Sequence, residues 1–188
     1  MSASLGRIVA VSAMSALLSV PAAAQFDPFS GSPLLAAAKS GDYTAAEQQV
    51  STGASVNQVD VHGQSAAIIA SKEGHCDILI LLLRHNARTN IKDNEGDTAL
   101  MWAAARDQLL CVKALVAARA DVNAANRQGV TALMKASQAG HLDVVKELIA
   151  AKADLTLTDF AGLTALGYAE SGRKRQVIDA LKAAGARN

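Results

Sequence analysis

The chain has 188 residues, of which 51% are hydrophobic, 19% charged and 3% aromatic, so it can bury a core but is too short for more than one or two ordinary domains. Its 18 basic and 17 acidic residues nearly balance, which argues against nucleic acid and acidic membrane surfaces as partners. Much of the apolar content is alanine, which suits closely packed helices better than a twisted sheet.

The N-terminal segment has the pattern of a secretory signal. Arg7 is its only charged residue, and the apolar or small residues at 8–20 lead to Pro-Ala-Ala-Ala before a cleavage point at Gln25. The apolar run is too short to span a bilayer comfortably. A helix of the folded domain and an uncleaved anchor are the alternatives. We predict a cleaved signal over residues 1–24, a linker over 25–31, and a soluble periplasmic protein without stable membrane insertion.

The rest of the chain repeats with a period of 33 residues. A glycine recurs four times, a Ser or Thr follows each of these glycines, an alanine recurs five times, and an asparagine follows the first three alanines. These columns are Gly63, Gly96, Gly129 and Gly162; Ser65, Thr98, Thr131 and Thr164; Ala54, Ala87, Ala120, Ala153 and Ala186; Asn57, Asn90 and Asn123. So many coincident columns exclude a chance alignment.

Each unit predicts two helices. The Ser or Thr caps a first helix with an apolar stripe, such as Leu100, Ala103 and Ala104. A second helix with apolar spacing near 3.6 follows a Gly or polar break, as in residues 142–151. An Ala-Asp-Val-Asn type segment and a turn, whose Gly fits a positive φ, close the unit. We expect units at residues 32–61, 62–94, 95–127, 128–160 and 161–188.

These motifs resemble ankyrin repeats. The family pattern, a β-turn followed by G-x-T-P-L-H-x-A-A, G-H, a leucine-rich helix and G-A-D-V-N, is similar to GDTALMWAAA with ARADVN and to GVTALMKAS with GHLDVVKELIAAKADL. The resemblance covers residues 32–188. It implies an all-α ankyrin-repeat solenoid of paired antiparallel helices with β-turn or hairpin connections, in about five repeats including caps.

One departure from the family pattern bears on stability. The usual turn glycine before the Asp-Val-Asn segment is kept as Gly53 and Gly185, but Asn86, Arg119 and Lys152 replace it in the internal units. These replacements cost local stability if φ is positive there.

The terminal units carry polar residues on their outer faces. In the last unit Glu170, Arg175 and Lys182 occupy columns that are apolar or small elsewhere, and in the first unit Gln49 replaces a leucine. A terminal repeat needs such substitutions because nothing covers its outer face. We therefore expect both ends to be caps, with no second domain.

Trp102 is the only tryptophan and lies on a first helix, about 200° around the axis from Leu100. Its column reads Ala36, Ile69, Trp102, Lys135 and Tyr168. A column that mixes lysine with aromatic residues does not suit a core. Trp102 either covers neighbouring alanines and is half buried, or forms with Tyr168 a pair of anchors for a partner, since such residues dominate interfaces.

The resemblance implies that turn tips and first helices line a concave groove that holds partner proteins. The predicted binding residues are Trp102, Tyr168, Lys135, Ile69, Asn94, Glu95, Arg106, Arg127, Gln128, Phe160 and Leu163. Phe160 and Leu163 would form an apolar patch near the C-terminal end of the groove, beside a charged region around Glu95 and Arg106.

The two cysteines are predicted to remain buried thiols. An exported protein meets an oxidising compartment, which favours a disulfide. However, Cys76 and Cys111 occupy columns two residues apart that face different directions on the helix. Neighbouring helix axes also lie about 8–10 Å apart, whereas a bridge needs Cα atoms within about 7 Å. We therefore predict no disulfide.

No pattern indicates a metal, a cofactor or catalysis. His75 and His141 match the family's structural histidine, and His62 and His85 lie in predicted turns without a second ligand at metal-binding spacing. No catalytic triad order, phosphate loop or carboxylate pair can be assembled from the remaining residues.

We therefore expect a monomeric, non-enzymatic protein-binding module in the periplasm, whose partners are one or more unidentified proteins. The alternative is an accessory factor in oxidative-stress protection that handles redox chemistry or a haem-related small molecule. This alternative follows from a resemblance to small exported ankyrin proteins of bacteria. It requires a reactive thiol or a coloured preparation.

Overall fold

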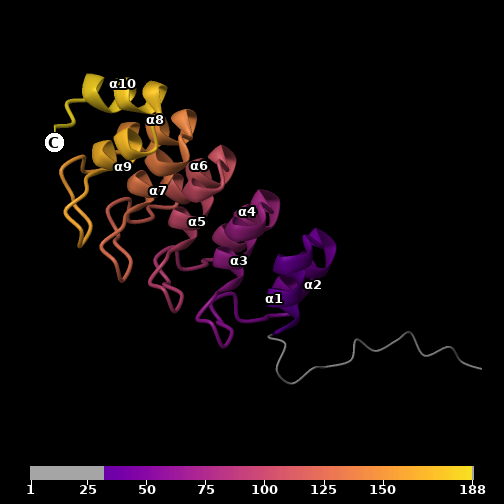
Figure 1. Ribbon diagram of the computed structural model, residues 1–188. Coiled ribbons are helices and arrows are strands. Elements are labelled where there is room, and N and C mark those ends of the chain that lie inside the picture. Colours follow the sequence, from indigo (N-terminus) through magenta and orange to yellow (C-terminus); the bar gives the residue numbers. More distant parts are fainter. Residues whose placement is uncertain (1–31, 188) are drawn as a thin grey trace, which may run out of the picture.

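The computed structural model describes residues 32–187, and these form a stack of five antiparallel helix pairs (Figure 1). The predicted signal at residues 1–24 and the predicted linker at residues 25–31 lie outside the described residues. Across residues 32–187, every helix is too short or too polar to cross a membrane.

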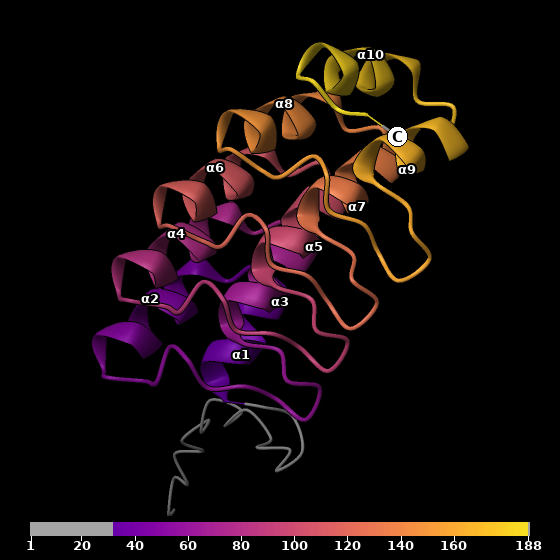
Figure 2. The same cartoon turned by 90° about the vertical axis from the view of Figure 1, so that its left-hand side faces the viewer.

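The helices lie in two layers (Figure 2). The inner layer contains the first helix of each pair: α1 (Pro33–Ser40), α3 (Ala66–Glu73), α5 (Ala99–Ala105), α7 (Ala132–Ala139) and α9 (Ala165–Ser171). The outer layer contains α2 (Tyr43–Ser51), α4 (Cys76–Arg84), α6 (Leu109–Ala117), α8 (Leu142–Ala150) and α10 (Arg175–Ala183). Each helix packs on its partner and on the equivalent helices before and after it. This arrangement confirms the predicted all-α repeat solenoid.

The repeated Ser or Thr begins each inner helix after the first hairpin. The hydroxyl oxygens of Ser65, Thr98, Thr131 and Thr164 accept hydrogen bonds from the backbone N–H three residues later. Behind these caps, the predicted stripe of Leu100, Ala103 and Ala104 is buried in the core. The N-cap therefore sets where each helix starts, and so which residues face the stack.

The repeated asparagine links one repeat to the next. Its side-chain oxygen accepts the backbone N–H of a residue 31 positions further on: Asn57 from Arg88 at 2.7 Å, and Asn90 from Asp121 at 3.0 Å. Asn123 accepts from Asp154 at 2.8 Å in the same way. These hydrogen bonds explain why a side chain that can accept a backbone N–H recurs in this column.

The end of the last pair is polar on its outer face, as predicted. Arg175 and Lys182 are exposed on α10, and the Lys182 ammonium lies 3.1 Å from the Glu170 carboxylate of α9.

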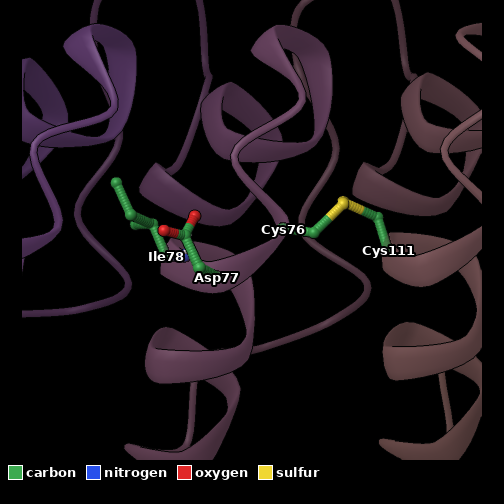
Figure 3. The surroundings of a disulfide bond; sticks show 4 residues. All are labelled: Cys76, Asp77, Ile78 and Cys111. Atoms are coloured by element: carbon green, nitrogen blue, oxygen red, sulfur yellow. Dashed lines mark hydrogen bonds between the residues drawn. A yellow bond between two sulfur atoms is a disulfide. The ribbon is translucent and has the colours of Figure 1, made fainter.

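The two cysteines form a disulfide, so the prediction of free thiols is wrong. Cys76 and Cys111 point toward one another from the first turns of α4 and α6 (Figure 3), with Cα atoms 5.0 Å apart. A step of two residues turns a helical side chain by about 200°. The pairs in the stack have similar orientations, so Cys76 on α4 faces the next pair and Cys111 on α6 faces the preceding one. Their opposite directions on the helix therefore bring the two side chains together.

The Cα atoms of two facing residues lie closer together than the axes of their helices. Each Cα lies about 2.3 Å from its own helix axis. Two Cα atoms on the facing sides of neighbouring helices therefore come much closer than the axes do. The axis separation is the wrong quantity for residues that face one another.

We predict that removing this cross-link lowers stability substantially. The disulfide spans 35 residues, and closing a loop of that length lowers the free energy of the native state relative to the unfolded chain by about 3–4 kcal/mol. Cys76→Ala with Cys111→Ala should lower the free energy of unfolding in urea by about this amount. A dithiol reductant should produce a similar loss in the wild type and none in the variant. Titration of two free thiols in folded, unreduced protein would contradict the cross-link.

The outer helices of the three internal pairs end in a left-handed residue that is not glycine. Asn86, Arg119 and Lys152 have φ values of 62°, 60° and 64°, so the condition on which a local loss of stability was expected, a positive φ, is met. Arg119 and Lys152 are exposed. For a residue with a Cβ atom, this conformation costs about 1–2 kcal/mol of free energy.

We predict that glycine at these positions stabilises the protein. Arg119→Gly with Lys152→Gly should raise the free energy of unfolding by about 0.5–1 kcal/mol per site, because relief of the left-handed strain exceeds the entropy that glycine adds to the unfolded chain. Lys146→Gly, at an exposed position inside α8, is the matched control and should lower stability by about 1 kcal/mol. A loss of stability in the double variant would contradict the strain argument.

Candidate protein-binding surface

An Asp or Asn side chain shapes the tip of each hairpin between helix pairs. Its Oδ1 atom accepts two backbone N–H groups, two and four residues later, over 2.8–3.0 Å. The four residues are Asp60, Asp93, Asn126 and Asp159. Aspartate and asparagine suit this role because the short side chain folds back onto its own turn. This column was not among the residues predicted from the sequence, although it repeats with the same period of 33 residues.

The tips are joined in a row by backbone hydrogen bonds. The N–H groups of Asn94, Arg127 and Phe160 donate to the carbonyl oxygens of His62, Glu95 and Gln128 in the preceding hairpins, at 2.9–3.1 Å. Gly96 permits this approach, because a Cβ there would lie only 2.8 Å from the Arg127 nitrogen. The hairpin tips (residues 60–64, 93–97, 126–130 and 159–163) and the inner helices together are called the hairpin face below (Figure 2).

The two aromatic residues of the Trp102 column brace hairpins. The indole N–H of Trp102 donates to Oδ2 of Asp93 at 2.9 Å, and the hydroxyl of Tyr168 donates to Oδ2 of Asp159 at 2.6 Å. Asp93 and Asp159 thus each use one carboxylate oxygen for the turn and the other for the inner helix. Trp102 and Tyr168 are both half buried, so they fix the hairpins and still expose part of their rings.

Lys135 occupies the same column on inner helix α7, after the third hairpin. Its ammonium nitrogen lies 2.8 Å from Oδ2 of the buried Asp97, whose Oδ1 accepts from the Asn126 amide at 2.8 Å. The same ammonium group lies 5.7 Å from the centre of the Trp102 ring, and that of Lys72 lies at 4.9 Å. Cations of the chain itself therefore contact the indole ring.

The pKa values of Tyr168 and Asp159 are both shifted in the folded chain. Burial, and then the hydrogen bond to the Asp159 carboxylate, raise the pKa of Tyr168 to about 12. The pKa of Asp159 is lowered, chiefly by the hydrogen bond from Tyr168 and then by that from the Leu163 backbone. At neutral pH the carboxylate is charged and the phenol is protonated, which is the form that the hydrogen bond needs.

Family comparisons agree with this architecture. A model of ankyrin repeats in three copies matches residues 34–126, and a second model of ankyrin repeats in many copies matches residues 115–169. The chain belongs to the ankyrin-repeat family. No curated protein matches it. Membership supports a role in protein–protein interaction.

The predicted binding residues of this ankyrin-repeat protein differ in how far they reach solvent. Trp102, Tyr168 and Lys135 are half buried, and Ile69 is buried at 6% exposure. The exposed residues are Asn94, Glu95, Arg106, Arg127, Gln128, Phe160 and Leu163. The structure thus places the exposed residues on the tips and at the end of α5, and the column of Trp102 beneath them.

The described residues offer no metal centre. Across residues 32–187, no group of three or more His, Cys, Asp or Glu side chains is placed to hold a metal ion. The hollow of about 490 Å³ on the hairpin face lies between the first two hairpins and the inner helices, against Ile69 and Trp102.

We predict that Tyr168 titrates far above an ordinary tyrosine. Tyr43→Phe leaves Tyr168 as the only tyrosine of the two in the chain, so its phenolate absorbance can be followed directly. The midpoint should lie near pH 12 and should move toward 10 when Asp159→Asn is added. Asn126 shows that asparagine can hold this type of turn.

The raised pKa of Tyr168 also determines how the stability of the fold changes with pH. The fold raises the pKa of Tyr168, so the stability gained from its protonated form is complete below about pH 10 and is lost as the pH rises through about 12. Tyr168→Phe should therefore lose less stability than the wild type over this range. A phenolate midpoint near 10 in the Tyr43→Phe protein would contradict the pairing.

Proposed function

We propose that the protein is a non-enzymatic binding module that holds a partner protein on its hairpin face. The observation that carries this proposal is the tip column of Val61, Asn94, Arg127 and Phe160. These residues are all exposed and differ in every repeat, whereas the turn residue before each is always Asp or Asn. The turn residues hold the hairpins through their side chains. Among the tip residues within residues 32–187, only the Asn94 side chain takes part in the stack, by donating to the Val61 carbonyl at 3.2 Å, so the side chains of Arg127 and Phe160 are available to a partner.

The apolar tips are the part of this surface that best suits binding to a protein. Val61 is 75% exposed and Phe160 is 84% exposed, and Leu163 beside Phe160 is also exposed. Large apolar side chains in water cost free energy that the stack does not recover. Aromatic side chains such as Phe160 are enriched in the cores of protein interfaces. The Phe160–Leu163 patch therefore suits an apolar contact, with charged Arg127 on the neighbouring tip.

The proposal includes export to the periplasm. The N-terminal pattern ending before Gln25 supports it, and so does the Cys76–Cys111 disulfide, because such bonds persist in oxidising compartments. The disulfide also takes up both cysteines of the chain. A role in redox chemistry through reactive thiols is therefore not part of the proposal.

The experiment is site-specific cross-linking in intact cells. A photoreactive residue at position 160 should give a discrete cross-linked product of higher mass, because that side chain reaches solvent at the hairpin face. The matched control is position 110, where Leu110 is 60% exposed on outer helix α6. We expect no such product from position 110. The cross-linked chain should appear in the periplasmic fraction and begin at Gln25.

The outcome can refute each part separately. Equal cross-linking from positions 160 and 110 would contradict the hairpin face as the binding surface. Recovery of the product from the cytoplasmic fraction with residues 1–24 intact would contradict export and leave the binding surface standing.

A further inference from the structure

The first hairpin lacks the brace found in the second and fourth. Asp60 shapes its turn like the others, with Oδ1 accepting the N–H groups of His62 and Gln64 at 2.8 Å. The position of Trp102 and Tyr168 is occupied here by Ile69, whose hydrocarbon side chain cannot donate a hydrogen bond. Among residues 32–187, no group donates to the second carboxylate oxygen of Asp60.

A hollow lies where the missing donor would be. It measures about 490 Å³ and is bounded by the first two hairpins and by α1, α3 and α5. Asp60, Ile69 and Trp102 all line it, so it combines a carboxylate whose second oxygen has no donor among the described residues, an apolar side chain and an aromatic ring. A single amino-acid side chain fits a space of this size.

The charges around the hollow favour a cation. Four carboxylates line it, those of Asp60, Glu73, Asp93 and Glu95, against the two ammonium groups of Lys39 and Lys72. Within residues 32–187, Lys72 has no hydrogen bond or ion pair, and its ammonium group lies 4.9 Å from the centre of the Trp102 ring. An incoming cation can therefore displace it without breaking a salt bridge.

The other side of Trp102 shows what such a site looks like when it is filled. There the ammonium group of Lys135 pairs with the hairpin carboxylate of Asp97 at 2.8 Å and lies 5.7 Å from the indole ring. The chain itself thus places a cation between a hairpin carboxylate and Trp102. The hollow offers the same two elements, Asp60 and the ring, but the Lys72 ammonium that lies over the ring forms no salt bridge with any described carboxylate there.

We propose that this hollow binds the guanidinium group of an arginine side chain from the partner protein. The guanidinium donates to the second oxygen of Asp60 and replaces the donor that Ile69 does not supply. Its planar group stacks on Trp102, and its aliphatic stem packs on Ile69. The further N–H groups of arginine reach the surrounding carboxylates, which a compact ammonium group would reach less well. The identity of the donor as a partner's residue rests on the proposed function.

The test uses small probes and the single tryptophan. N-acetyl-arginine amide is titrated into the full chain while the Trp102 indole N–H resonance is followed, which needs no assignment because the chain has one tryptophan. We expect a saturable shift. N-acetyl-citrulline amide has nearly the same shape without the charge and should bind at least about tenfold more weakly, because it loses a charge-assisted hydrogen bond.

Two variants locate the site. Asp60→Asn keeps a turn acceptor, as Asn126 does, and should weaken arginine amide binding about tenfold. Ile69→Tyr places a phenol where Tyr168 stands in the last repeat, so it should fill the hollow, brace the first hairpin and abolish binding. The fold of each is checked by its unfolding transition. Asp143→Asn, on an exposed residue of α8, is the matched control and should bind as the wild type does.

Equal binding of the citrulline probe, unchanged binding by Asp60→Asn, or no saturable shift with arginine amide would each overturn the arginine site. The proposed function fails independently. If the cross-link from position 160 is absent while the arginine amide still binds through Asp60, the hollow is an arginine site and the hairpin face is not the partner surface.

Discussion

Each helix pair has two apolar faces, and only the pairs before and after it can cover them. This constraint fixes the stripe of Leu100, Ala103 and Ala104 and its equivalents, and it keeps the Ser or Thr that starts each inner helix in register. It also explains the asparagine column, because the stack holds only if each loop stays in line with the next. The polar residues of the last pair mark the place where the constraint no longer applies.

The same stacking separates structural from recognising residues within a few positions. In the last hairpin, Asp159 holds the turn with one oxygen and Tyr168 with the other, whereas Phe160, the very next residue, contributes nothing to the core. A repeat protein can therefore vary its tips without disturbing its fold. The Trp102 column lies between these extremes, because its members brace a hairpin and still reach the surface.

The sequence was sufficient for the features that one repeat determines by itself. The helix caps, the buried stripe and the left-handed positions of Asn86, Arg119 and Lys152 all follow from local chemistry repeated at a fixed period. The contacts between repeats were harder to predict from the sequence. Cys76 and Cys111 were placed on the correct columns, but the interpretation compared their directions on one helix and not across two facing helices.

The surface was predicted in part for a similar reason. The exposed tips at Asn94, Arg127 and Phe160 were expected, because the resemblance to ankyrin repeats implies that partner-binding residues lie on the turn tips. The turn carboxylates were not, since an aspartate in a polar loop carries no sign that both of its oxygens have partners. The exception at Asp60 was not predictable from the sequence either. It depends on whether the residue nine positions further on, Ile69, can donate a hydrogen bond to Asp60 in the folded chain.

The disulfide joins the second and third of five helix pairs, which has a consequence for how the array opens. In a nearly one-dimensional array, local unfolding starts at an end and moves inward one interface at a time. A covalent link makes two neighbouring units open together, so fraying should meet its largest barrier between α4 and α6. The hollow at Asp60 is lined by residues of the first three pairs, and the disulfide joins two of these pairs, so the shape of the hollow should be fixed. The Phe160 patch lies two interfaces further along, where no cross-link restricts local unfolding and the array can adjust its shape to a partner.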